Sequence, residues 1–419
     1  MGPRVATRRW ELPLLGGLVV AAFAFRVALA IAIAPLQAPD EAAHVRYVKY
    51  ISVHARLPVQ SEFEFSRIAA RWDEYHQPPL AYLLFAPIDR LVRARSGAAL
   101  PTLRALRVQN ALYGTAAVAI GFFAAALLTP PGDPRRWLVA LALAFTPGIA
   151  VNSSVVNNDG LANLLCAALW LALLRSPPRW QTAAAAGGLL GAACLAKPTA
   201  IVLAPLLWGA PVLLHRAGFS LALRHALVSA GVAIAVLSPW LVRNVLVYGD
   251  PFGIGGGAMT FGQLAQVRPD VAEQFFDPSR LVPNAFLQFW GVFGTRNGVR
   301  WQPVQLWFTA LGVLAVVGWL VPLGGRGRDP LERGAACFVA AFALAAFALV
   351  YVSIVFVGGA QGRYLYTAAL PVMLLLASGW ARLSNGHRSV YLVTGLGASF
   401  VALDVGLVVF LSRVFAAQS

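Results

Sequence analysis

Long apolar stretches separated by short polar segments recur along the whole chain. Clear examples are residues 12–34, 108–128, 306–323, 335–357 and 390–411. Each is close to the roughly 20 residues that a helix needs to cross the hydrocarbon core of a bilayer. The pattern therefore predicts an all-α integral membrane protein with about 11 transmembrane helices.

Two polar regions are too long for simple connections between spans and too polar to cross a membrane. They cover residues 35–104, where we expect interfacial helices and the active site, and residues 243–302. Nothing between them can be separated as a soluble unit. We therefore expect one polytopic membrane domain over residues 1–419.

The distribution of positive charge predicts the orientation. Arg4, Arg8 and Arg9 precede the first apolar stretch, which places the N-terminus in the cytoplasm. Alternation of the spans then makes both long polar regions extracytoplasmic. Of the 17 acidic residues, 12 fall on that face: Asp40, Glu41, Glu62, Glu64, Asp73, Glu74, Asp89, Asp159, Asp250, Asp270, Glu273 and Asp277.

Composition supports a membrane protein and argues against a nucleic-acid partner. The chain is 59% hydrophobic and 12% charged, whereas a soluble domain carries about 25% charged residues. The net charge of +16 comes mostly from arginines in loops between spans, and no basic stripe with stacking aromatics is present. Three single cysteines within apolar stretches predict neither a disulfide framework nor a cysteine metal cluster.

The densest group of reactive residues, APDEAAHVRYVKY, follows the first apolar stretch. In a helix starting there, Asp40, His44 and Tyr47 share one face, while Glu41 points about 100° away. Such a group can supply a general base, or Asp40, Glu41 and His44 can hold a divalent metal ion. The alternative is an aspartate that only caps a solvated interfacial helix.

Five further polar motifs lie at the predicted outer ends of the spans. They contain His76 and Gln77 in YHQPPL, Asn158 and Asp159 in NNDG, Lys197 in AKPT, Arg243 in WLVRN, and Arg363 and Tyr364 in QGRY. The three basic residues are candidates for binding a phosphate. Helix capping, snorkelling to headgroups and anchoring of helix ends remain the alternatives. Asp404, inside the last span, has no partner that the sequence identifies.

These motifs, in this order and over nearly the whole chain, resemble the polytopic GT-C glycosyltransferases that use polyprenyl-phosphate sugars. That group contains the protein O-mannosyltransferases and the aminoarabinose transferase of lipid A. PDEAAH near the start and QGRY near the end are most similar to a bacterial branch of related membrane proteins. The resemblance implies a bacterial plasma-membrane enzyme with Asp40 as catalytic base, Glu41 as the other member of the acidic pair, and basic residues on the donor phosphate.

The implied reaction is an inverting single displacement that moves a sugar to an acceptor hydroxyl on the extracytoplasmic face. The expected partners are a polyprenyl-phosphate sugar donor, a glycan, lipid or protein acceptor, and membrane lipid. A divalent metal is a possible cofactor. The alternative functions are a transporter or flippase of lipid-linked sugars and a non-catalytic assembly subunit. A transporter favours polar residues through the bilayer midplane and paired repeats, whereas the polar motifs here gather at one face.

Overall fold

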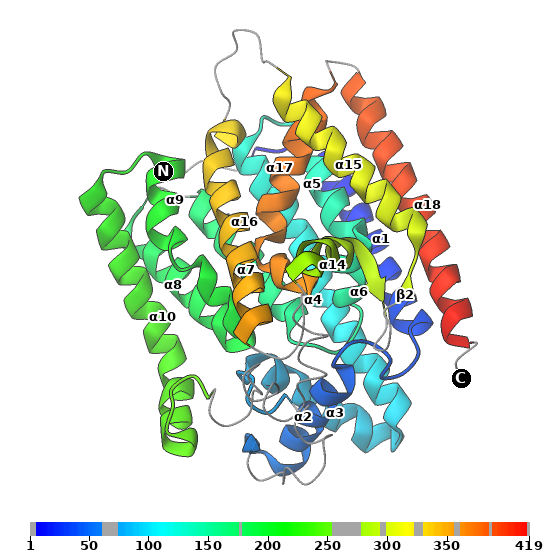
Figure 1. Ribbon diagram of the computed structural model, residues 1–419, viewed down its shortest axis with the longest axis vertical. Helices are drawn as coiled ribbons and strands as arrows, with labels where there is room; N and C mark the ends of the chain where they lie inside the picture. Colours follow the sequence, from blue (N-terminus) through cyan, green and yellow to red (C-terminus); the bar gives the residue numbers. More distant parts are fainter. Residues whose placement is uncertain are drawn as a thin grey trace.

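The computed structural model describes residues 6–60, 74–175, 178–253, 278–293, 299–321, 330–355, 361–384 and 388–416. Long apolar helices dominate it (Figure 1). Seven segments of the described chain are long and apolar enough to cross a membrane. They are α1 (Glu11–Ala32), α4 (Ala99–Leu128), α10 (Phe219–Tyr248), α15 (Gln302–Leu320), α16 (Pro330–Val355), the 3₁₀ helix η4 (Gly362–Ala368) with α17 (Ala369–Arg382), and α18 (Arg388–Ala416).

The other predicted spans fall on shorter helices. These are α5 (Pro134–Phe145) with α6 (Pro147–Asn152), α7 (Asp159–Arg175), α8 (Trp180–Ala196) and, beyond the 3₁₀ helix η3 (Pro198–Leu203), α9 (Leu206–His215). Prolines interrupt two of these spans: Pro147 separates α5 from α6, and Pro198 ends α8, because proline cannot donate the backbone hydrogen bond that continues a helix. The prediction of an all-α multi-pass membrane protein is confirmed.

Helices differ in how far they lie inside the bundle. In the most apolar window of α4, 61% of residues are buried, against 22% in α10 and in α18. Accordingly, α10 and α18 stand at opposite edges of the molecule in Figure 1, where their apolar side chains are available to lipid. The central helices, among them α4, α5, α7 and α17, share one large apolar core that includes Phe122, Leu143, Trp170 and Met373.

The first long polar region forms two helices outside the main bundle. These helices, α2 (Glu41–His54) and α3 (Leu80–Ser96), lie together at the lower end of the molecule in Figure 1. There α3 packs against both α2 and the start of α4. Buried aromatic residues, including Tyr47, Tyr82 and Phe85, form their shared core. The predicted helices within 35–104 are therefore present, and residues 61–73 lie outside the described residues.

The second long polar region contains the end of α10, the helix α14 (Pro278–Gly291) and a two-stranded antiparallel pair, β1 (Val292–Phe293) with β2 (Val299–Arg300). Helix α14 contacts α6, α15 and η4. Residues 254–277 lie outside the described residues. With those of 61–73, six of the predicted outer acidic residues fall there: Glu62, Glu64, Asp73, Asp270, Glu273 and Asp277.

Candidate functional site

Four segments that are distant in sequence bring charged side chains together at the end of the bundle next to α2. The turn before α2 supplies Asp40, the start of α7 supplies Asp159, the end of α8 supplies Lys197, and η4 supplies Arg363. All four were candidate site residues in the sequence. We call this group the charged cluster.

Asp40 occupies the position just before α2, in a left-handed backbone conformation with φ of 58°. Aspartate is one of the few residues other than glycine that visit this region readily. Its side chain makes no capping hydrogen bond to the helix, and instead accepts one from Nη2 of Arg363. Capping therefore does not explain Asp40, whose carboxylate is directed at another segment of the chain.

Asp159 starts α7 but does not cap it either. The side chain of Asn157 accepts hydrogen bonds from the backbone N–H groups of Asp159 and Gly160, at 3.0 and 3.2 Å. This leaves the Asp159 carboxylate to pair with Lys197 through Oδ1. Its Oδ2 lies 3.7 Å from Nη1 of Arg363 and accepts no hydrogen bond from the described residues.

The two cations alternate with the two carboxylates in the order Asp40, Arg363, Asp159, Lys197. Nε of Arg363 donates to the side chain of Gln361 at 2.6 Å, and the ammonium of Lys197 lies 4.9 Å from the ring centre of Tyr364. The exposed fractions of the acidic side chains differ sharply, at 35% for Asp40 and 2% for Asp159. Asp40 is therefore the carboxylate of the cluster that a substrate can reach.

An aromatic wall on α2 and α3 lies next to Asp40. Nδ1 of His44 is 2.9 Å from the hydroxyl oxygen of Tyr82. The rings of Tyr47 and Tyr82 stack with centroids 3.9 Å apart, and Tyr75 meets Tyr47 edge to face. His44 and Tyr47 of α2 thus both contact Tyr82 of α3, whereas the carboxylate of Asp40 pairs with Arg363 of η4.

The pKa values of the groups around this wall follow from burial and neighbouring charge. Burial raises the pKa of Asp40, but Arg363, His44 and Lys197 together outweigh it and hold the pKa below its ordinary 3.8. Burial lowers the pKa of His44 below 6.5 despite the nearby acidic groups. Burial also raises the pKa of Glu74. At neutral pH, Asp40 is therefore ionised and His44 is neutral.

His76, Gln77 and Asn158 lie in one polar connection between the α2–α3 region and the start of α7. Nδ2 of Asn158 donates to Oε1 of Gln77 at 3.4 Å, and the backbone oxygen of Gln77 accepts from Tyr47 at 3.2 Å. Nε2 of His76 is 4.0 Å from Glu74 and 3.5 Å from the amide nitrogen of Gln77. These predicted residues therefore border the charged cluster rather than forming ion pairs within it.

Glu41 does not join the cluster. It is completely buried, and Arg107 donates to its two carboxylate oxygens at 2.8 and 2.6 Å. The backbone N–H of Val156 donates to the same carboxylate at 2.9 Å. Glu41 is the first residue of α2 and pairs with Arg107 of α4, whereas Asp40 precedes the helix in a left-handed conformation and pairs with Arg363 of η4.

The expected metal ligands Asp40, Glu41 and His44 are therefore not assembled around one point. Both carboxylate oxygens of Glu41 accept hydrogen bonds from Arg107. The carboxylate of Asp40 forms an ion pair with Arg363. Within the described ranges, no group of three or more histidine, cysteine or acidic side chains is placed to hold a metal ion. The predicted ligand set Asp40, Glu41 and His44 does not fit a divalent ion.

Arg243 is also placed apart from the cluster's ion pairs. Near the end of the peripheral helix α10, its Nη2 donates to the backbone oxygen of Pro58 at 2.6 Å. Its guanidinium carbon lies 5.0 Å from the centre of the Trp240 ring. Arg243 thus ties the end of α10 to the chain that follows α2, as the anchoring alternative describes.

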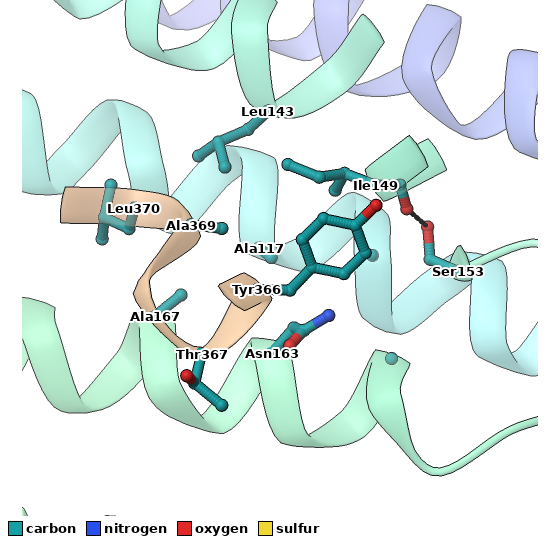
Figure 2. A pocket seen from close by; sticks show the side chains of 12 residues that line it. Ala117, Leu143, Ile149, Ser153, Asn163, Ala167, Tyr366, Thr367, Ala369 and Leu370 are labelled. Atoms are coloured by element: carbon teal, nitrogen blue, oxygen red, sulfur yellow. Dashed lines mark hydrogen bonds between the residues drawn. The ribbon is translucent and has the colours of Figure 1, made fainter. Parts of the chain in front are cut away.

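A small closed cavity lies behind the cluster, between α4, α5, α7 and the η4–α17 segment (Figure 2). Figure 2 shows the ring of Tyr366 between Ile149 and Asn163, with Thr367 close by. The cavity measures about 30 Å³, room for a water molecule or two. A sugar or a prenyl chain cannot occupy a cavity of this size.

Sequence reasoning missed two residues that shape the site. Tyr82 contacts His44, and Arg107 neutralises Glu41. In the sequence, Tyr82 is one of several apolar and aromatic residues in its segment. Arg107 is one of many arginines in loops and at the ends of spans. The available signal for Arg107 was its place in the second span, because a charged side chain at membrane depth needs a buried partner.

No protein-family model and no curated protein sequence matches this chain. Among solved structures, the oligosaccharyltransferase of Archaeoglobus fulgidus in the apo form matches with a TM-score of 0.54 and 14% identity, over 97% of this chain and 57% of that chain. The same enzyme tethered with an acceptor peptide containing the NVT sequon matches with a TM-score of 0.53 and 13% identity, over 96% of this chain and 55% of that chain.

A further match is ArnT from Cupriavidus metallidurans bound to undecaprenyl phosphate, with a TM-score of 0.40 and 16% identity, over 89% of this chain and 78% of that chain. This chain thus spans little more than half of the archaeal enzyme. The fold is similar to that of the archaeal oligosaccharyltransferase.

Proposed function

We propose that the protein is a membrane glycosyltransferase that moves a sugar from a polyprenyl-phosphate donor to an acceptor hydroxyl on the extracytoplasmic face of a bacterial plasma membrane. The observation that carries the proposal is the charged cluster. It places one accessible, ionised carboxylate beside two cations at one end of a bundle of apolar helices. A fold shared with an oligosaccharyltransferase supports the same reaction class.

In this proposal Asp40 is the catalytic base. Its carboxylate accepts the proton of the acceptor hydroxyl as the acceptor oxygen forms a bond to the anomeric carbon. The bond from that carbon to the phosphate oxygen breaks, and the electron pair leaves with the polyprenyl phosphate. A single displacement of this kind inverts the anomeric configuration. The pKa of Asp40 below its ordinary value keeps the carboxylate ionised, although it also limits the strength of the base.

Lys197 and Arg363 would stabilise the leaving phosphate. Lys197 has three N–H donors and uses one on Asp159. Arg363 has five and uses one on Asp40 and one on Gln361. Both cations therefore retain donors for phosphate oxygens. Stabilising charge that develops in the transition state is commonly the largest catalytic contribution of an active site.

The roles proposed for the other predicted site residues follow from where each lies relative to the charged cluster. His76, Gln77, Asn158 and Tyr364 border the cluster and can bind the sugar or the acceptor. We assign Arg243 to the anchoring of α10, given its bond to Pro58. The bilayer around the exposed apolar helices would hold the prenyl chain, since α10 and α18 leave most of their apolar windows unburied.

The test is the mass of the lipid that co-purifies with the protein. The protein is purified in mild detergent, the bound lipid is extracted, and its mass is measured with and without a phosphate-linked sugar. We expect a polyprenyl phosphate or its glycosylated form, at a lower level in Lys197→Ala. Purified wild-type protein that retains only ordinary phospholipid, and transfers no sugar from added polyprenyl-phosphate sugars, would contradict the proposal.

A further inference from the structure

The buried pair Glu41–Arg107 has no place in the displacement reaction, yet Glu41 directly follows Asp40 in the chain. Both side chains are almost completely buried, with exposed fractions of 0% and 2%. Arg107 extends from α4 and makes two hydrogen bonds to Glu41, the first residue of α2. The pair therefore connects a central helix of the bundle to the start of the helix that follows Asp40.

Arg107 also holds the end of the helix that precedes Asp40. Its Nη1 donates to the backbone oxygens of Ala30 and Ile33 at 2.7 and 2.6 Å, and its Nη2 donates to Ala34 at 3.0 Å. The last carbonyls of an α-helix have no partner within the helix, and they favour a positive charge. One guanidinium thus closes the C-terminal end of α1 and binds the N-terminal residue of α2.

The chain between these two points contains a residue in an unfavourable conformation. Leu36 and Asp40 both have positive φ, at 60° and 58°. Aspartate visits this region readily, whereas a leucine persists in it only where the surrounding structure holds it. Arg107 donates hydrogen bonds to Ala34 on one side of this connection and to Glu41 on the other.

The same pair also reaches the loop that carries the second carboxylate of the cluster. Glu41 accepts a hydrogen bond from the backbone N–H of Val156, three residues before Asp159. Asn110, one turn along α4 from Arg107, donates to the backbone oxygen of Val155 at 2.6 Å. Contacts from one short stretch of α4 therefore hold the chain next to both Asp40 and Asp159.

We infer that Glu41 and Arg107 are positioning residues that hold the Asp40 carboxylate in its reactive place relative to Asp159 and Arg363. The inference rests on the proposed function, because it concerns the geometry of the proposed base. It replaces the expectation that Glu41 takes part directly in catalysis.

The chain contains a matched control at the opposite end of the bundle. Arg136 and Glu11 are also completely buried, with Nη1 of Arg136 at 3.2 Å from Glu11. Arg136 closes the C-terminal end of another helix, because its Nη2 donates to Thr129 at 2.6 Å just beyond α4. Arg107→Lys and Arg136→Lys therefore make the same chemical change to the same kind of pair, near and far from the charged cluster.

The experiment compares Tm, polyprenyl-phosphate binding, kcat and KM for the two variants in detergent. We expect both variants to lose stability, whereas only Arg107→Lys should lower kcat per folded molecule, by about 10²-fold, because displacement of a reacting group by about 1 Å has an effect of that size. Binding of polyprenyl phosphate should survive in both. Equal kcat in the two variants would overturn the inference. Glu41→Gln supplies the same comparison if Arg107→Lys does not fold.

A double-mutant cycle separates this inference from the proposed function. In an Asp40→Asn background, Arg107→Lys should cause no further loss of kcat, because the group it positions has lost its basicity. An additive loss would show that Arg107 acts on something other than Asp40. If Asp40→Asn alone keeps wild-type turnover, the proposed base is wrong; if it is inactive while Arg107→Lys is fully active, only the positioning role is wrong.

Discussion

The carboxylate of Asp40 accepts a hydrogen bond from Arg363, although 323 positions separate the two residues in the sequence. This pair joins the turn before α2 to the 3₁₀ helix η4 that leads into α17. Asp159 lies on the other side of Arg363, at 3.7 Å, and Lys197 completes the cluster. The chemistry proposed for the protein depends on this contact between the two ends of the chain.

Replacement of Asp40 by Asn should lower turnover by about 10²-fold or more, the usual contribution of a positioned general base. Asn keeps the shape of the side chain and also tolerates a positive φ, so folding and donor binding should survive. The measurement is kcat for sugar transfer by purified protein. Asp89→Asn is the control, because Asp89 lies in the same region but pairs with Arg93. Near-wild-type transfer by Asp40→Asn would make Asp159 the next candidate.

Removal of either cation of the cluster should weaken binding of polyprenyl phosphate. One charge-assisted hydrogen bond is typically worth about 1.5–3 kcal/mol, or roughly 10- to 150-fold in Kd. We expect losses in this range for Lys197→Ala and Arg363→Ala, and little change for Arg243→Ala, whose guanidinium binds the backbone of Pro58. Titration of each variant with polyprenyl phosphate gives the affinities. Unchanged affinity in the first two variants would show that Lys197 and Arg363 do not bind the phosphate and only pair with Asp159.

The stability contributed by His44 should disappear as the solution is acidified. Burial holds the pKa of His44 below 6.5 in the folded protein, so folding favours the neutral ring. The contribution is therefore complete above about pH 6.5 and is lost as pH falls toward the folded pKa, at about 1.4 kcal/mol for each unit of pKa difference. Tm should fall from about pH 7 to about pH 5 more steeply in the wild type than in His44→Gln. Parallel pH profiles would contradict this assignment.

The orientation can be tested with two single cysteines at opposite ends of the bundle. The three natural cysteines are buried and should stay silent. Ser96 is exposed at the end of α3, and Ser220 is exposed in the first turn of α10. In intact cells Ser96→Cys should react with an impermeant maleimide, while Ser220→Cys should react only after lysis. The reverse pattern would place the charged cluster in the cytoplasm.

The sequence by itself determined the class of fold, and it predicted the segments that supply the charged cluster. Apolar stretches of membrane-spanning length fix helices in a bilayer, because an unpaired backbone in hydrocarbon is too costly. Each predicted span falls on a helix. The motifs around Asp40, Asp159, Lys197 and Arg363 were visible as polar residues at the ends of predicted spans, where helix capping and anchoring were the alternative roles.

Only the tertiary structure decided which of these residues meet. Local spacing predicted that Glu41 points away from Asp40. It contained no information that Asp40 would precede the helix in a left-handed conformation or that Arg107 would neutralise Glu41. It also could not distinguish Arg363, which reaches Asp40, from Arg243, which binds Pro58. Arg363 lies at the start of the η4–α17 segment, and Arg243 lies near the end of α10. Their contacts differ because the first segment lies largely inside the bundle and α10 lies at its edge. Helix packing, which depends on contacts across hundreds of residues, therefore decided which arginine meets Asp40.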